Sequence, residues 1–211
     1  MGNEDRATYL KNRYGRSQSF VNRREQRFVA DMLAMMERPL AHILDVPCGH
    51  GRFTPQLRPE ASERLVCGDI SVDHIEALLG AESDDGTPVE TIQIDVYKPF
   101  PFDDEEFDLV FNFRFFHHVR KDEQRQHLIK ELVRVAKRYL VISYYESAPI
   151  HALQKRLWRR EGHSRDLPMV PRQDFLRMFA QQGCRLLDDR GVLPGIHAHR
   201  VALFEKHGGL S

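Results

Sequence analysis

AHILDVPCGHGRF, the run at residues 41–53, joins a buried strand to a glycine-bearing turn and the start of a helix. Residues 41–46 are apolar, as in the strands of a parallel sheet, and the acidic Asp45 falls at their end. Gly49 and Gly51 follow in the turn, and a helix is expected to open near residue 52. Because glycine has no side chain, the backbone of such a turn can lie directly against a ligand.

Two further strands downstream also end in an aspartate. The segment LVCGDIS places Asp69 at the end of a strand over residues 64–69, and TIQIDVY places Asp95 at the end of a strand over 89–95. In an open α/β sheet, ligands bind at the carboxyl ends of the strands, where the strand order reverses. We therefore expect Asp45, Asp69 and Asp95 to converge on one ligand site.

The same alternation of strands and helices continues to the end of the chain. Helices are predicted over residues 18–37, 52–58, 72–80, 121–137 and 172–182, and the remaining strands over 107–113, 139–145, 184–190 and 198–206. This order favours an α/β fold with a doubly wound, mostly parallel sheet and helices on both faces. No helix separates the final two strands, so one of the seven strands is expected to run antiparallel.

The motifs that contain the three aspartates resemble those of class I S-adenosylmethionine (SAM)-dependent methyltransferases. That family's first motif often reads D-x-P-C-G-x-G. In this chain the motif consists of Asp45, Pro47, Cys48, Gly49 and Gly51. The stretch PFPFDDEEFDLVF, residues 99–111, is also similar to the family's segment leading into its fourth strand. The resemblance covers about residues 41–145 and implies a Rossmann-like sheet whose last strand is antiparallel.

The resemblance also implies how the cofactor SAM would be held. Asp69 is placed to accept both ribose hydroxyls, because one carboxylate can accept two hydrogen bonds. Asp95 would accept from the adenine amino group, and the backbone of Val96 would meet a ring nitrogen. Asp45 could orient the turn or contact the amino group of SAM. The expected cofactor contacts are Asp45, Pro47, Cys48, Gly49, Gly51, Asp69, Ile70, Asp95, Val96 and Asn112. Alternatively, Asp69 or Asp95 could cap the helix that follows.

Candidates for the reactive centre follow the fourth and fifth strands. The run NFRFFHHV, residues 112–119, contains His117 and His118, and Tyr144 lies near the end of the next predicted strand. Methyl transfer from a sulfonium requires alignment of nucleophile, methyl and sulfur, and in some reactions removal of a proton. His117, His118 and Tyr144 are the catalytic candidates. The alternative is a loop histidine with structural hydrogen bonds only. We predict no metal site, because one site would need convergent ligands.

Residues 146–170 form an insertion that is too long for a simple turn. Its stretch HALQKRLWRR can form a basic amphipathic helix. Such a helix would act as a lid that excludes water and shapes the acceptor pocket, with the N-terminal segment around Tyr9 and Tyr14 as the opposite wall. The alternative is a peripheral helix that packs on the edge of the sheet.

The composition is that of a globular protein of 211 residues, with 41% hydrophobic residues, 29% charged residues and no formal net charge. This length predicts one domain over residues 1–211. The sequence lacks a run long enough for a membrane span, lacks a secretory signal and contains only three cysteines, which predicts a cytoplasmic location. The basic segments 1–27 and 146–172 would attract an anionic substrate, unless they are ordinary solvated helix faces.

These features favour SAM-dependent methyl transfer to a small-molecule or lipid-linked acceptor, with S-adenosylhomocysteine (SAH) as product. Both basic segments could also contact a membrane surface, and we rank nucleic acid below these partners. One alternative is a catalytically silent SAM-binding or partner-binding domain, and another is a methyltransferase acting on RNA or protein. An NAD-dependent oxidoreductase lacks support, because Thr54 stands where G-x-G-x-x-G requires its last glycine.

Overall fold

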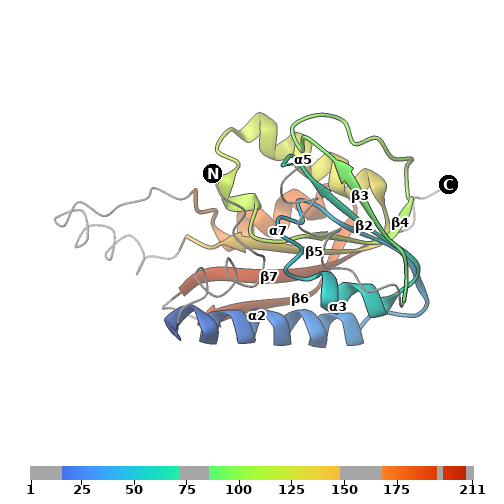
Figure 1. Cartoon of the computed structure of the whole chain (residues 1–211). Helices are drawn as coiled ribbons and strands as arrows, with labels where there is room; N and C mark the ends of the chain where they lie inside the picture. Colours follow the sequence, from blue (N-terminus) through green and yellow to red (C-terminus); the bar gives the residue numbers. More distant parts are fainter. Residues whose placement is uncertain (1–15, 72–85, 148–167, 194–196, 208–211) are drawn as a thin grey trace.

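The structure is a computed structural model that describes residues 16–71, 86–147, 168–193 and 197–207 (Figure 1). Three expected features lie outside these residues. They are the helix over 72–80, the lid helix within the insertion 146–170, and the N-terminal wall with Tyr9 and Tyr14.

A seven-stranded sheet with the order β3-β2-β1-β4-β5-β7-β6 forms the centre of the fold (Figure 1). Its strands are β1 (Leu40–Asp45), β2 (Ala61–Asp69), β3 (Val89–Gln93), β4 (Phe107–Asn112), β5 (Ala136–Tyr145), β6 (Cys184–Leu193) and β7 (His197–Lys206). The first five strands pair in parallel, and β7 pairs antiparallel with both β5 and β6. The predicted fold class is confirmed, including the antiparallel last strand.

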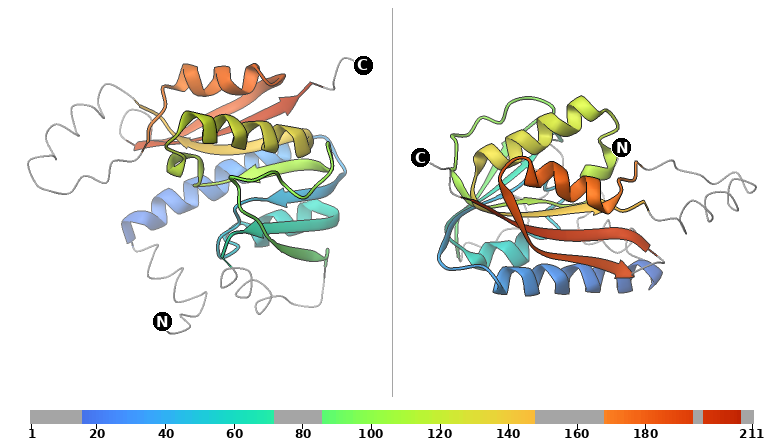
Figure 2. Two further views of the ribbon diagram at one scale, coloured as in Figure 1. Left: turned by 90° about the horizontal axis from the view of Figure 1, so that it is seen from above. Right: turned by 180° about the vertical axis from the view of Figure 1, so that it is seen from behind.

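Helices cover both faces of this sheet (Figures 1 and 2). On one face lie α2 (Arg16–Ala34) and α3 (Thr54–Leu57), and on the other lie α5 (Asp122–Val135) and α7 (Arg172–Ala180). The helix expected over 52–58 is shorter than predicted, and a 3-10 turn (Arg58–Glu60) replaces its end. Pro59 lies in that turn, and proline cannot donate the backbone hydrogen bond that would continue an α-helix.

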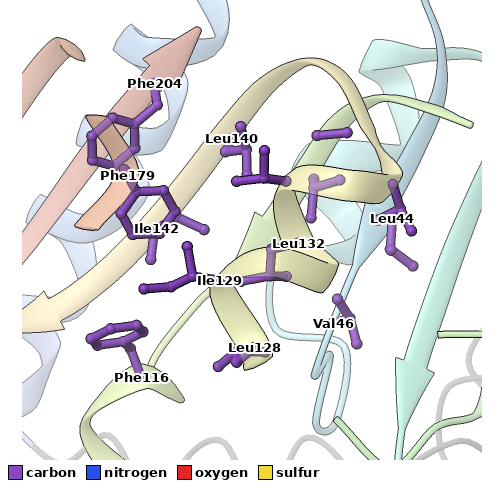
Figure 3. Close-up of a cluster of buried hydrophobic side chains, with 14 of the residues drawn as sticks. Leu44, Val46, Phe116, Leu128, Ile129, Leu132, Leu140, Ile142, Phe179 and Phe204 are labelled. Carbon is purple, nitrogen blue, oxygen red and sulfur yellow. The ribbon is translucent and has the colours of Figure 1, made fainter. Parts of the chain in front are cut away.

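Each helical layer packs its apolar side against the sheet. Under α5 and α7, Leu132 and Phe179 are fully buried against Leu140 of β5 (Figure 3). On the other face, Val29 and Met32 of α2 join a separate buried cluster that includes strand residues of β1 and β4. This apolar burial is the main stabilising contribution to the fold, and it fixes the sheet whose carboxyl edge carries the site.

All seven strands differ from their predicted ranges by one to three residues at one end or both, among them β3 and β5. Strand β3 ends at Gln93, so Asp95 lies in the turn beyond the strand and not at its end. Strand β5 begins at Ala136, directly after α5, where a helix to residue 137 is expected. Among the described helices, none combines the length and the apolar character needed to cross a membrane.

Candidate active site

The carboxyl ends of the parallel strands bring the predicted cofactor residues together. Strand β1 ends at Asp45, β2 at Asp69 and β4 at Asn112. The chain order reverses between β1 and β4, which are neighbours in the sheet. A ligand in an open α/β sheet binds at such a reversal. Asp45, Asp69 and Asn112 therefore lie at the carboxyl ends of neighbouring strands, and Asp95 follows the end of β3.

The glycine turn after β1 is held against the neighbouring strands. The Cys48 N–H donates to the Gly68 carbonyl at 2.8 Å, and the Val46–Pro47 peptide bond is cis. Gly49 and Gly51 adopt φ values of +55° and +63°, a region that glycine enters without steric cost. A Cβ atom built on Gly49 would meet no atom of the described chain within 4 Å. The turn therefore presents bare backbone to open space.

Asp69 is the anchor of this turn. Its Oδ2 accepts the Gly49 N–H at 2.9 Å, and its Oδ1 accepts the Ser71 N–H at the same distance. The carboxylate is almost fully buried, whereas Ile70 beside it is 63% exposed. A carboxylate has about four lone-pair sites, so it can hold a turn and also accept from a ligand hydroxyl. Holding the turn and contacting a ribose are compatible roles, and the second remains a prediction.

Asp95 and Val96 lie one strand further along the edge. The Asp95 Oδ1 accepts the Tyr97 N–H at 3.1 Å, which closes a short turn. Val96 is buried, while Tyr97 is 40% exposed and its ring lies 6.2 Å from that of Phe115. A pair of rings, one exposed and one half-buried, next to a carboxylate suits an adenine base, and this role too remains a prediction.

Asn112 and Cys48 complete the cofactor side of the site. The Asn112 Nδ2 donates to the Val46 carbonyl at 2.7 Å, which ties the end of β4 to the glycine turn. The side chain is fully buried, and its Oδ1 has no hydrogen-bond partner in the part of the chain that the structure describes. Cys48 contacts Cys67, and this contact together with burial keeps its thiol pKa far above the usual range. Cys48 is therefore an unreactive support beneath the turn.

Asp45 is a buried carboxyl that ionises less readily than an ordinary aspartate. It is 2% exposed, and burial raises its pKa well above the ordinary value, with further contributions from Cys67 and Asp69. A buried carboxyl of this kind would be stabilised as the anion by a cationic ligand. SAM is such a ligand, since it carries an ammonium and a sulfonium.

We expect SAM affinity to rise with pH through the range in which Asp45 ionises in the free protein. If the ammonium of SAM lies beside Asp45, binding lowers the carboxyl pKa and releases a proton, so affinity increases up to tenfold per pH unit and then levels off above the raised pKa. Calorimetry in buffers of different ionisation enthalpy measures this release. In Asp45→Asn the proton release should vanish, and its persistence would assign it to another group.

The catalytic candidates are not all brought together. His117 is buried and its ring lies 4.1 Å from that of the exposed His118. Tyr144 points to the opposite face of the sheet, where it stacks on Phe175 at 3.7 Å and its hydroxyl lies 3.3 Å from both carboxylate oxygens of Asp189. This placement favours a structural role for Tyr144. Its neighbour Tyr145 faces the site instead, with its ring 4.4 Å from that of His117.

The sequence analysis missed Glu25, a fully buried carboxylate on α2. Its oxygens lie 2.5 Å from Arg52 Nη2, 2.7 Å from Arg114 Nη2 and 2.7 Å from His199 Nδ1. Burial opposes ionisation of Glu25, but the contact with His199 and the two guanidinium groups outweigh it and lower the pKa to about 2. Glu25 thereby links α2 to the glycine turn, to the segment after β4 and to β7.

Comparison with known proteins finds a methyltransferase domain in the central part of the chain. A family model described as a methyltransferase domain matches residues 43–138, which contain the glycine turn and all three aspartates. Residues 43–138 therefore make up a methyltransferase domain, and the seven-stranded sheet has the fold of SAM-dependent methyltransferases. No curated protein matches the chain in sequence.

Solved structures with the same fold cover nearly the whole chain. A magnesium protoporphyrin IX methyltransferase from Synechocystis PCC 6803 with bound SAH has a TM-score of 0.76 at 15% identity, over 96% of this chain and 94% of that chain. A SAM-dependent methyltransferase from Methanosarcina mazei has a TM-score of 0.67 at 17% identity, over 85% of this chain and 96% of that chain. A third similar structure is a complex between the Haloferax volcanii Trm112 methyltransferase activator and a putative methyltransferase. One of its chains has a TM-score of 0.67 at 16% identity, over 98% of this chain and 100% of that chain.

Proposed function

We propose that the chain transfers the methyl group of SAM to a small-molecule or lipid-linked acceptor. The observation that carries this proposal is the glycine turn, which Asp69 holds open and which faces unfilled space at Gly49. An intact turn of this kind argues against a catalytically silent relative. Among the described residues, the rim beyond β4 and β5 carries the rings of His117, His118 and Tyr145, which suits a small acceptor.

In this proposal the cofactor spans the edge from β3 to β4. Asp95 and Val96 contact the adenine, with Ile70 against its face, and Asp69 binds the ribose. Asp45 and Asn112 lie nearest the amino-acid end of SAM. These roles are supported by the order of the residues along the sheet edge and by the exposure of Ile70. We also place the activity in the cytoplasm, in keeping with three buried cysteines that form no disulfide.

Asp69→Ala should weaken SAM binding by roughly 1–3 kcal/mol, the range for losing charge-assisted hydrogen bonds. The variant loses the ribose contact and also releases the Gly49 N–H. Asp69→Asn keeps one acceptor oxygen for that N–H, so it separates the two effects. Calorimetric titration measures both variants. If Asp69→Ala bound SAM as the wild type does, the ribose assignment would be wrong.

Transfer of an isotopically labelled methyl group tests the proposed function itself. The purified protein is incubated with methyl-labelled SAM and a fractionated cell extract, and labelled products are identified by mass spectrometry. We expect label in a small molecule or lipid and SAH in equal amount. Label that appears only in RNA or protein would overturn the acceptor class, and SAM binding without any transfer would favour a silent binding domain.

A further inference from the structure

The side of the site over β4, β5 and β7 has the chemistry of an acceptor subsite, an inference that rests on the proposed function. The three aspartates of the cofactor side belong to β1, β2 and the turn after β3. The strand order places β4, β5 and β7 on the other side of β1. His117 follows β4, Tyr145 ends β5, and His199 lies opposite Tyr145 in the register of β5 with β7.

His117 is built into this side as a buried polar group. Its side chain is packed against the rings of His118 and Tyr145 at 4.1 Å and 4.4 Å, and the residue is only 7% exposed. Its Nδ1 has no hydrogen-bond partner among the described residues. A buried polar atom without a partner is costly, and one at an active site is explained by a ligand that supplies the missing bond.

The groups that act on the His117 ring electrostatically are two histidines and an arginine. They are His118, His199 and Arg114, and no described carboxylate appears among them. Arg114 is fixed in place, because its Nη2 and Nε lie 2.7 Å and 3.2 Å from the Glu25 carboxylate. Its backbone N–H donates to the Ser143 hydroxyl at 2.6 Å, and its φ of +55° is unusual for a residue with a side chain.

This environment makes His117 and Tyr145 poor proton acceptors. Burial, assisted by the neighbouring bases, lowers the pKa of His117 to about 3, so the ring is neutral at physiological pH and a very weak base. Burial raises the pKa of Tyr145, so its hydroxyl stays protonated. Neither His117 nor Tyr145 is therefore a suitable base for an acceptor that must lose a proton before it attacks.

We propose that the acceptor presents a carboxylate to His117, beside Arg114, and is methylated on oxygen. A carboxylate is ionised without help from a base. The Nδ1–H of neutral His117 donates to one carboxylate oxygen, and the rings of His117 and Tyr145 contact the apolar body of the acceptor.

The reaction balances without a proton transfer. The free carboxylate oxygen attacks the methyl carbon of SAM, and a carbon–oxygen bond forms as the carbon–sulfur bond breaks. The electron pair of the broken bond stays on sulfur, so the sulfonium becomes the neutral thioether of SAH. The anionic acceptor becomes a neutral methyl ester.

Benzoate and its uncharged analogue benzamide test this inference on the full-length protein saturated with SAH. The two probes have nearly the same shape, so a difference in affinity reports the carboxylate. We expect benzoate to bind roughly tenfold more tightly than benzamide, as one charge-assisted hydrogen bond would give. Equal affinity, or no binding of benzoate at millimolar concentration, would overturn the inference.

Variants of His117 show whether this residue makes the contact. His117→Phe retains a ring but loses Nδ1, so the preference for benzoate should disappear. His117→Asn retains an N–H near the position of Nδ1 and should restore most of it. His207→Phe, at the exposed end of β7, is the matched control and should bind both probes as the wild type does. Loss of SAH affinity in His117→Phe would instead assign His117 to the cofactor.

The product of the labelled transfer distinguishes this inference from the proposed function. A methyl ester releases labelled methanol on mild alkaline hydrolysis, and this is the expected result. A labelled amine or thioether would contradict the carboxylate while leaving methyl transfer to a small molecule intact. If the folded protein failed to bind SAH, that result would instead contradict the proposed function.

Discussion

Glu25→Gln should lower the free energy of unfolding by about 3 kcal/mol, the lower end of the cost of breaking a buried ion pair. The lower end applies because Arg52 and Arg114 retain 12% and 26% side-chain exposure, so water partly compensates them. For a protein of this size the loss corresponds to a fall in Tm of roughly 6–12 °C. Thermal or urea unfolding at neutral pH measures it.

The pH dependence of this effect follows from the direction of the pKa shift. The Glu25 pKa falls from 4.5 to about 2 on folding, so its contribution is fully present above the unfolded value and is lost as the pH falls toward 2. The stabilities of wild type and Glu25→Gln should therefore converge in acid. Glu37→Gln is the control, because Glu37 pairs with Arg138 on the exposed surface and should change stability little. Equal effects of the two variants would contradict the role of the buried cluster.

Gly49→Val should reduce SAM affinity at least about a hundredfold, which is ~2.7 kcal/mol. Two causes combine. The φ of +55° at Gly49 is strongly unfavourable for a β-branched residue, and the new side chain would project into the open space that we assign to the cofactor. Calorimetric titration with SAM measures the loss.

Gly183→Val separates these two causes. Gly183 has a φ of +75° and equally open surroundings, but it lies in the turn between α7 and β6, far from the sheet edge that carries the site. Gly183→Val should be destabilised by the same unfavourable backbone conformation as Gly49→Val, but it should bind SAM as the wild type does. Wild-type SAM affinity in Gly49→Val would show that the cofactor does not lie against this turn.

The cofactor side of the site could be predicted because its signals are local. Asp45, Asp69 and the glycine turn are each encoded by an apolar strand followed by a short polar break. What the sequence could not show is that Asp69 also binds the Gly49 N–H, since that bond depends on how β1 and β2 pair. Asp95 was placed correctly along the chain, but its strand ends two residues earlier.

The acceptor side depends on contacts that sequence patterns do not record. Tyr144 and Tyr145 are identical neighbours on β5, and only the packing of Phe175 against one and His117 against the other assigns them to opposite faces. Glu25 lies in a basic stretch of α2, where an acid suggests an ordinary surface pair. Its partners Arg52, Arg114 and His199 come from three other parts of the chain, and only the fold brings them together.

Calorimetric titration of the wild-type protein with SAM, SAH and NAD tests the central claim most directly. SAM and SAH should each bind with a stoichiometry of one, and NAD should give no binding heat. Binding should also raise the Tm in proportion to ligand concentration, as mass action requires. Folded protein that binds no SAM at millimolar concentration, or that binds NAD as tightly as SAM, would contradict the assignment of this site to methyl transfer.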